Sequence, residues 1–185
     1  MTLTRTITLF GSSRPQPGEP AYAQAYELGH TLASSGFRVC NGGYGGTMEA
    51  SAKGAKDAGG MTIGVTCDLF SRSPNPWIDE ERRTPRLEER LITLAQLGDG
   101  YVVLPGGTGT LLELAYVLET INKGFTKERP IVLLGSHWTP ALEPLKAEMR
   151  EGRIEKWANF IIVAKGPEDA VKRLEFAIGG SSGFR

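Results

Sequence analysis

Short apolar runs alternate with amphipathic stretches along most of the chain. Apolar runs of this length are typical of strands buried on both faces of a sheet, and the longer stretches carry apolar residues at helical spacing. The predicted strands are Thr6–Phe10, Arg38–Cys40, Met61–Val65, Tyr101–Leu104, Pro130–Leu134 and Phe160–Val163. The predicted helices are Pro20–Ser34, Thr47–Ala58, Leu87–Leu97, Thr108–Lys123, Pro140–Arg150 and Pro167–Ile178. The alternation predicts an α/β fold, a Rossmann-like, doubly wound parallel sheet with helices on both faces.

One segment breaks this alternation. Residues 67–84 contain Pro74, Pro76 and Trp77 and show little periodicity. They predict a long irregular loop, and loops of that length in compact domains are often functional. The length of 185 residues suits a single domain over residues 1–185. Residues 179–185 are expected to form a frayed tail.

The stretch Leu104–Glu113 places a glycine loop between a buried strand and a helix. Glycines let the main chain approach a ligand, and the unpaired N–H groups of a helix start favour an anion. The loop therefore predicts a phosphate site formed by Gly106, Gly107, Thr108, Gly109 and Thr110. Glu113 is expected in the first turn of the helix, where it accepts hydrogen bonds from ribose hydroxyls or stabilises positive charge on a sugar. The alternative is an acid that only favours the helix dipole.

Two further turns rich in glycine or serine follow predicted strands, at Phe10–Arg14 and Asn41–Thr47. With strand order 3-2-1-4-5-6, all three turns converge where the order reverses, between the first and fourth strands. Ser12, Arg14 and Gly43 are therefore candidates to bind phosphate or ribose. Each turn alone is a weak signal, because strand-to-helix turns often need glycine for geometry. Neither glycine loop is a P-loop or a dinucleotide fingerprint, so a mononucleotide is the expected ligand.

The helix Leu87–Leu97 carries Arg90 at the margin of its apolar stripe. The residues alone favour a solvated surface arginine, since most charged helix residues face water. The alternative is a side chain turned toward a cleft. His30, His137 and Cys67 show no pattern that favours a chemical role.

Charge and cysteine content exclude several classes of function. Lys and Arg together number 21, as do Asp and Glu, so the formal net charge is zero and an extended surface for a nucleic-acid polymer or a membrane is not expected. Cys40 and Cys67 have no metal-site spacing, which argues against a metal site and a disulfide and fits a reducing cytoplasm. With no signal peptide or transmembrane run in the sequence, we expect a soluble cytoplasmic protein.

The stretch Pro105–Glu113 matches the pattern P-G-G-x-G-T-x-x-E, and the turn Phe10–Ser13 and the glycines of Asn41–Thr47 also fit. In these features the chain resembles the Lonely Guy (LOG) family, formerly described as possible lysine decarboxylases. The resemblance implies a phosphoribohydrolase that needs no cofactor and cleaves a nucleoside 5′-monophosphate, such as AMP or N6-modified AMP, into ribose 5-phosphate and base. It implies that Arg90 and Glu113 are the essential residues, and that the chain forms a homodimer around the Arg90 helix. A decarboxylase is disfavoured, because no lysine for a Schiff base lies at these strand ends.

Two stretches depart from the cytokinin-type pattern. The family usually has Met-x-x-Arg-Lys where this chain has Leu87–Leu91, and Gly-Leu-Met-Gly where it has Gly46–Glu49. The second departure resembles a neighbouring branch related to molybdenum-cofactor carrier proteins, which bind a phosphorylated ligand without cleaving it. A binding protein is therefore the alternative, and the presence of Arg90 and Glu113 favours the enzyme.

Overall fold

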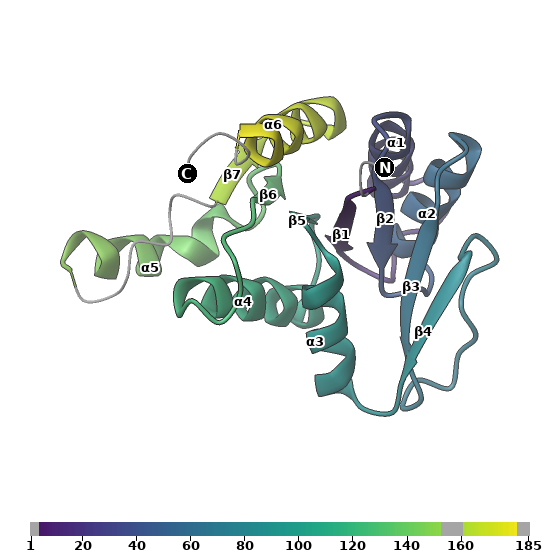
Figure 1. The fold of residues 1–185 in the computed structure, drawn as a ribbon, viewed down its shortest axis with the longest axis horizontal. Coiled ribbons are helices and arrows are strands. Elements are labelled where there is room, and N and C mark those ends of the chain that lie inside the picture. Colours follow the sequence, from purple (N-terminus) through teal and green to yellow (C-terminus); the bar gives the residue numbers. More distant parts are fainter. Residues whose placement is uncertain (1–3, 153–160, 181–185) are drawn as a thin grey trace.

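The computed structural model describes residues 4–152 and 161–180, which form a parallel sheet flanked by helices (Figure 1). The sheet has seven strands in the order β4-β3-β2-β1-β5-β6-β7. The strands are β1 Thr6–Phe10, β2 Arg38–Asn41, β3 Thr62–Cys67, β4 Glu80–Thr84, β5 Gly100–Val103, β6 Ile131–Leu134 and β7 Ile161–Ala164. The helices are α1 Pro20–Ser34, α2 Thr47–Asp57, α3 Leu87–Leu97, α4 Thr108–Asn122, α5 Thr139–Arg150 and α6 Pro167–Gly180.

The predicted fold class and the predicted order of six strands are confirmed. The third strand begins at Thr62, one residue after Met61, and continues to Cys67. The predicted strand residue Phe160 lies outside the described residues. Of the predicted tail, Gly179 and Gly180 belong to α6, so that part of the prediction is wrong, and residues 181–185 lie outside the described residues.

The prediction of an irregular loop over residues 67–84 is wrong at both of its ends, since Cys67 closes β3 and the last five residues form β4. Strand β4 pairs in parallel with β3, from Ile63 opposite Glu80 to Cys67 opposite Thr84. All five of its residues are polar, which is why apolar periodicity misses it. The strand tolerates this composition because it lies at the edge of the sheet, where charged side chains also discourage pairing with another chain. The loop proper is residues 68–79.

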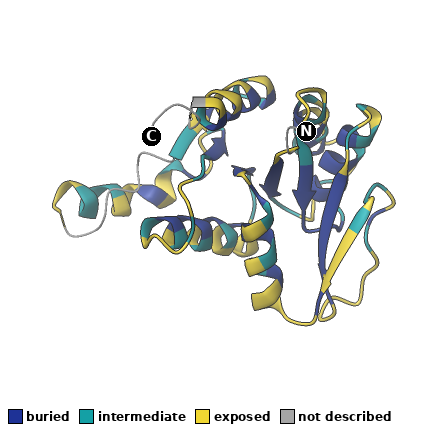
Figure 2. Ribbon diagram, viewed as in Figure 1, coloured by how far each residue is buried: buried dark blue, intermediate teal, exposed yellow. Residues whose placement is uncertain are grey.

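The helices form a layer on each face of the sheet. Helices α1, α2 and α6 pack on one face and α3, α4 and α5 on the other. The side chains of β1 alternate between these layers, with Ile7 and Leu9 in one core and Phe10 in the other, stacked on Tyr101 at 5.8 Å between ring centroids. Figure 2 shows the central strands fully buried and β4 largely exposed.

The strand order reverses beside β1, which pairs with both β2 and β5. Helix α2 follows β2 on one face and α4 follows β5 on the other, so their N-terminal ends lie at the carboxyl edge of the sheet on either side of this point. A crevice at such a position is the usual ligand site of an open α/β sheet. Over the described residues, no helix combines the length and the apolarity needed to cross a bilayer.

Candidate functional site

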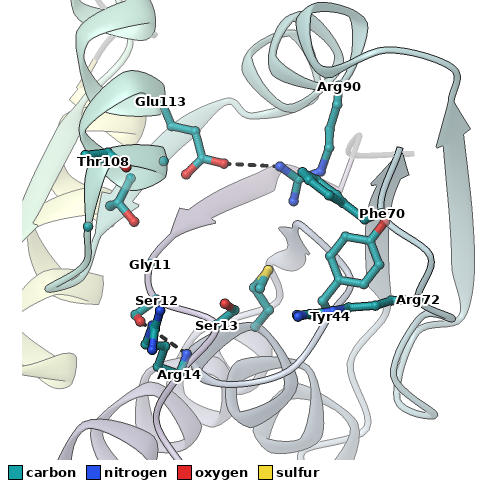
Figure 3. A pocket seen from close by; sticks show the side chains of 14 residues that line it. Gly11, Ser12, Ser13, Arg14, Tyr44, Phe70, Arg72, Arg90, Thr108 and Glu113 are labelled. Carbon is teal, nitrogen blue, oxygen red and sulfur yellow. Dashed lines mark hydrogen bonds and ion pairs between the residues drawn. The ribbon is translucent and has the colours of Figure 1, made fainter. Parts of the chain in front are cut away.

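A cleft of about 410 Å³ lies at the carboxyl edge of the sheet where the strand order reverses (Figure 3). Its walls come from the turn after β1, the turn after β2, the start of α2, the loop 68–79 and helices α3 and α4. The predicted site residues that line it are Ser12, Arg14, Arg90, Gly107, Thr108, Gly109, Thr110 and Glu113. The structure thus brings most of the predicted site into one concave surface, and Gly43 and Gly106 stand apart from it.

Helix α4 presents its N-terminal end to the cleft. Gly107 is the N-cap, and among the described residues no side chain caps this end. The N–H of Leu111 donates to the carbonyl of Gly107 at 3.0 Å, and the N–H groups of the three residues before Leu111 have no acceptor within the helix. Free N–H groups together with the positive end of the helix dipole make this end suited to bind an anion such as phosphate.

Gly106 shapes the turn before α4 without lining the cleft. A Cβ atom at Gly106 would lie 2.2 Å from Oγ1 of Thr110, which is buried. A larger residue would therefore push the turn away from the start of α4. Glycine at position 106 is therefore required by the geometry of the turn, and the predicted ligand contact of Gly106 stays a prediction.

Gly43 also lies outside the cleft lining, and its predicted ligand contact likewise stays a prediction. Its N–H donates to Oδ1 of Asn41 at 2.8 Å, and its carbonyl accepts from the N–H of Asn75 at 2.8 Å. Its φ of +79° is in the region that favours glycine. Gly43 therefore ties the second turn to the loop 68–79.

The first and second turns are locked together. The N–H and the hydroxyl of Thr47 donate to the carbonyl of Ser12 at 2.9 and 3.0 Å. A Cβ atom at Gly46 would lie 2.4 Å from the same carbonyl oxygen, so only glycine permits this approach. The contact holds Ser12 and Arg14 at the edge of the cleft, where the N–H of Arg14 donates to the Ser12 hydroxyl at 3.2 Å.

Arg90 is buried in the cleft wall, with 8% of its surface exposed, so the surface position favoured by its local sequence is wrong. Its Nε donates to the carbonyl of Val65 at 2.8 Å and its Nη2 to the carbonyl of Gly42 at 3.2 Å. A Cβ atom at Gly42 would lie 1.9 Å from Nη2, so the absence of a side chain there makes room for the guanidinium. Tyr44 and Phe70 place their rings 5.7 and 5.8 Å from its Cζ.

Glu113 faces Arg90 across the top of the cleft, with Oε1 3.6 Å from Nη1 (Figure 3). Helix α4 begins at Thr108, so Glu113 lies in its second turn, and the prediction of a first-turn acid is wrong. The Glu113 side chain is only 14% exposed. Burial raises its pKa from 4.5 to about 7, while the charge of Arg90 acts in the opposite direction. A role confined to the helix dipole is therefore inadequate, because the dipole effect is largely limited to the first turn.

The raised pKa of Glu113 makes the stability of the protein depend on pH. Between pH 4.5 and about 7 the unfolded chain has released this proton while the folded protein keeps it, so the free energy of unfolding falls as pH rises through this window. The shift corresponds to a loss of about 3 kcal/mol. The test compares the free energy of unfolding in urea at acidic and at alkaline pH. From acidic to alkaline pH, the Glu113→Gln variant should gain about 3 kcal/mol relative to the wild type, because it has no carboxyl at this position. An equal pH dependence in both proteins would contradict the buried carboxyl.

Six residues that line the cleft are not among the site residues named from the sequence: Gly11, Ser13, Tyr44, Met48, Phe70 and Arg72. Tyr44 carried a signal, as an aromatic residue set between glycines at the end of a strand. Phe70 and Arg72 belong to the segment expected to be functional because of its length, but no spacing identified them individually. Met48 resembled an ordinary apolar residue of α2.

The histidines and cysteines lie outside the cleft lining. His137 places Nε2 3.3 Å from the carbonyl oxygen of Gly106. Cys40 and Cys67 are buried and free, and burial raises the pKa of Cys40 to about 12, which disfavours its reactive thiolate form. Within residues 4–152 and 161–180, no cluster of three His, Cys, Asp or Glu side chains could hold a metal ion.

Comparisons with known proteins place this chain in a family. A family model described as "Possible lysine decarboxylase" matches residues 48–174, most of the chain, including Arg90 and Glu113. The cytokinin riboside 5′-monophosphate phosphoribohydrolase of Rhodococcoides fascians is 30% identical over 174 residues, which cover 90% of this chain and 87% of that protein. The chain belongs to the Lonely Guy (LOG) family.

Other similar proteins extend the comparison beyond the cytokinin enzymes. The pyrimidine/purine nucleotide 5′-monophosphate nucleosidase of Escherichia coli is 30% identical to this LOG chain over 128 residues, which cover 63% of this chain and 28% of that protein. A solved structure of the molybdenum-cofactor (Moco) carrier protein from Chlamydomonas reinhardtii superposes with a TM-score of 0.76 and 25% identity, covering 96% of this chain and 99% of that one. The LOG chain is therefore similar in sequence to two proteins named for nucleotide cleavage, and it shares its fold with a protein named as a cofactor carrier.

Proposed function

We propose that this LOG-family chain hydrolyses the N-glycosidic bond of a nucleoside 5′-monophosphate to ribose 5-phosphate and free base, with AMP and N6-modified AMP as the substrates that the family resemblance implies. The observation that carries the proposal is the buried pair of Glu113 and Arg90 in the same cleft as the uncapped start of α4. The relatives from Rhodococcoides fascians and Escherichia coli are both named for cleavage of nucleoside 5′-monophosphates, which supports it.

In this proposal the start of α4 binds the 5′-phosphate. The N–H groups from Thr108 to Thr110 donate to its oxygens, and Ser12 and Arg14 contact it from the opposite turn. Binding the phosphate at this point sets the ribose beneath Glu113, one helical turn further along α4. The phosphate thus provides binding energy that orients the reacting part of the substrate.

Glu113 then acts on the ribose. As the bond between the anomeric carbon and the base nitrogen lengthens, positive charge builds on the sugar ring, and a nearby carboxylate stabilises it. A water molecule forms the new bond to the anomeric carbon and loses a proton, while the base leaves with the bonding electrons and takes up a proton. Arg90 favours the ionised form of Glu113 against the effect of burial, and it stabilises negative charge on the departing base.

The activity should depend on pH through Glu113. Its carboxylate form is the active one, and its pKa is about 7 in the free protein. The ratio kcat/KM for AMP is therefore expected to increase as pH rises through about 7 and to level off above it. Initial rates from about pH 5 to about pH 9 would show this, and a flat profile would contradict the assigned role.

Free-base release tests the proposed reaction. Purified protein is incubated with AMP, N6-modified AMP, CMP and GMP, and base and ribose 5-phosphate are quantified. The expected result is equal amounts of both products from at least one substrate. Binding of nucleotide without release of base from any of the four would contradict hydrolysis.

A carrier for a nucleotide or phosphorylated cofactor is the second candidate function. The superposition with the Chlamydomonas reinhardtii Moco carrier protein over 96% of this chain favours it. The phosphate-binding end of α4 serves a carrier equally well, but a carrier does not require a buried carboxyl paired with an arginine. A carrier would capture its ligand tightly and return it unchanged.

We also propose that the chain acts as a homodimer in the cytoplasm. Large apolar side chains are exposed on α3 and α4, at Leu87, Ile92, Leu111 and Leu112. Such residues are often covered in oligomers, and sedimentation of the purified protein tests this. The free buried cysteines fit a reducing compartment, and the zero formal net charge fits a small-molecule substrate better than a nucleic-acid polymer or a membrane surface.

A further inference from the structure

One side of the cleft has no role in the chemistry described above. Figure 3 shows Ser12, Arg14 and Thr108 on one side and Tyr44, Phe70 and Arg72 on the other, with Glu113 above. The first side belongs to the phosphate. The second side carries two aromatic rings and a guanidinium, which comes from the loop 68–79.

Tyr44 is a fixed support for this side. It is buried, and its hydroxyl accepts from the N–H of Cys67 at 2.8 Å and donates to the carbonyl of Cys67 at 3.2 Å. Its ring contacts that of Phe70 edge to face, with centroids 5.7 Å apart and an interplanar angle of 83°. Phe70 is therefore held from behind.

Phe70 itself remains 40% exposed, although it is a large apolar side chain at the wall of a cleft. Its N–H donates to the carbonyl of Cys67 at 3.0 Å, which anchors this end of the loop to β3. A partly exposed aromatic ring on an anchored residue is suited to stack on a planar ligand group.

The proposed reaction determines where the base lies. With phosphate at the start of α4 and ribose against Glu113, the base extends toward Arg90, whose Nη1 is 3.6 Å from that carboxylate. The Phe70 ring centroid is 5.8 Å from Cζ of Arg90 and is next in this direction. Building on the proposed function, we propose that Phe70 and Arg72 form the base subsite, with Phe70 stacking on the base and Arg72 donating hydrogen bonds to its edge.

Arg72 gives the subsite a chemical preference. Within the described parts of the chain, its guanidinium has no hydrogen-bond or ion-pair partner, and arginine can only donate. The O6 and N7 atoms of guanine both accept and match a guanidinium fork, whereas adenine presents a donor at N6. The subsite therefore favours purines with an oxygen at this edge over adenine, so GMP takes the place of AMP as the preferred nucleotide of the proposed reaction.

The space behind this subsite fits the same preference. Phe70 and Arg72 also border a second cavity of about 580 Å³, whose walls include the charged side chains of Asp68, Glu81 and Arg83. An apolar substituent on the base that extended past Phe70 would displace water from these charged groups and offer them no hydrogen-bond or ion-pair partner in return, which is unfavourable. The subsite is thus suited to an unmodified base.

Nucleotide binding to the Glu113→Gln variant, which is expected not to cleave its ligand, tests the subsite. Calorimetry with GMP, AMP and ribose 5-phosphate compares two nucleotides with a ligand that lacks the base. In this background, Phe70→Ala is expected to weaken GMP and AMP binding about tenfold, as base stacking on an aromatic residue implies, and to leave ribose 5-phosphate binding unchanged. The matched control Phe176→Ala, at a residue of α6 that is 85% exposed, should change none of the three affinities.

A second comparison tests Arg72. The parent variant should bind GMP more tightly than AMP, and Arg72→Gln should remove most of that difference. The subsite would be overturned if Phe70→Ala weakened the affinity for all three ligands equally, or for none of them. An unchanged preference for GMP in Arg72→Gln would also overturn it. Because ribose 5-phosphate binding reports on the remaining cleft, it also shows whether each variant is folded.

The binding test of the base subsite is independent of the base-release test of the reaction. If the wild-type protein releases no base but Phe70→Ala still loses nucleotide affinity selectively, hydrolysis fails and the base subsite stands. If the wild type releases base and the Phe70 variant binds all three ligands normally, hydrolysis stands and the subsite fails.

Discussion

Replacing Glu113 by Gln is expected to lower kcat for nucleotide hydrolysis by about a thousandfold, the scale typical of losing an essential acid–base or charge-stabilising group. Gln has nearly the same shape and still accepts a hydrogen bond from a ribose hydroxyl, so the nucleotide should bind with little change. It carries no charge, and it can neither stabilise positive charge on the sugar nor accept a proton from water. The loss should therefore appear in kcat rather than in binding.

Steady-state kinetics with AMP or the best substrate, together with calorimetry, separates these effects. Glu119→Gln is the matched control, because Glu119 is an exposed residue of the same helix outside the cleft. It should retain wild-type turnover. Unchanged turnover in Glu113→Gln, or an equal loss in both variants, would contradict the catalytic role of Glu113.

Replacing Arg90 by Met should impair both activity and stability. Met fills much of the same space, but it removes the donors to the carbonyls of Val65 and Gly42 and the positive charge beside Glu113. Without that charge the pKa of Glu113 should rise further, so less of the active carboxylate is present at neutral pH. We expect kcat/KM to fall at least about a hundredfold and the free energy of unfolding to fall by about 2 kcal/mol.

Urea unfolding and kinetics at several pH values measure these changes. The rise of kcat/KM with pH should move to higher pH in Arg90→Met. The double variant Arg90→Met/Glu113→Gln should be more stable than the sum of the two single effects predicts, since no buried carboxyl is then left without its counter-charge. A fully additive double variant, with no shift in the pH profile, would indicate that the two side chains are not coupled.

The fold could be predicted from the sequence because its signals are local. Each central strand is a short apolar run, and each helix shows a stripe at helical spacing, so the order of elements and the point of reversal followed from general rules. Strand β4 lacked this signal. Its residues Glu80–Thr84 are all polar, and only pairing with β3 makes the segment a strand.

The candidate site could be predicted only in part, because part of it depends on long-range contacts. The glycine loop and Glu113 are adjacent in sequence, although a shift in the helix start moved Glu113 from the first turn to the second. Arg90 is different. Its burial depends on Gly42, 48 residues earlier, and on the carbonyl of Val65, and no pattern within α3 reveals either. The resemblance to a known family, not the local sequence, identified it.

The side of the cleft formed by Tyr44 and Phe70 could not be predicted from the sequence for the same reason. Tyr44 and Phe70 lie 26 positions apart and come together because the loop 68–79 folds back over the second turn. The Asn75 side chain holds this arrangement by donating to the carbonyls of Gly43 and Tyr44 at 3.1 and 2.8 Å. Such contacts follow from tertiary structure and not from spacing.

A crystal structure of the Glu113→Gln variant with bound AMP would test the central claim most directly. The expected result is a 5′-phosphate within hydrogen-bond distance of the N–H groups at the start of α4, with a ribose hydroxyl contacting the side chain at position 113. A phosphate bound elsewhere, or a ribose out of reach of position 113 while the start of α4 is occupied, would contradict the claim that this helix positions the sugar for cleavage.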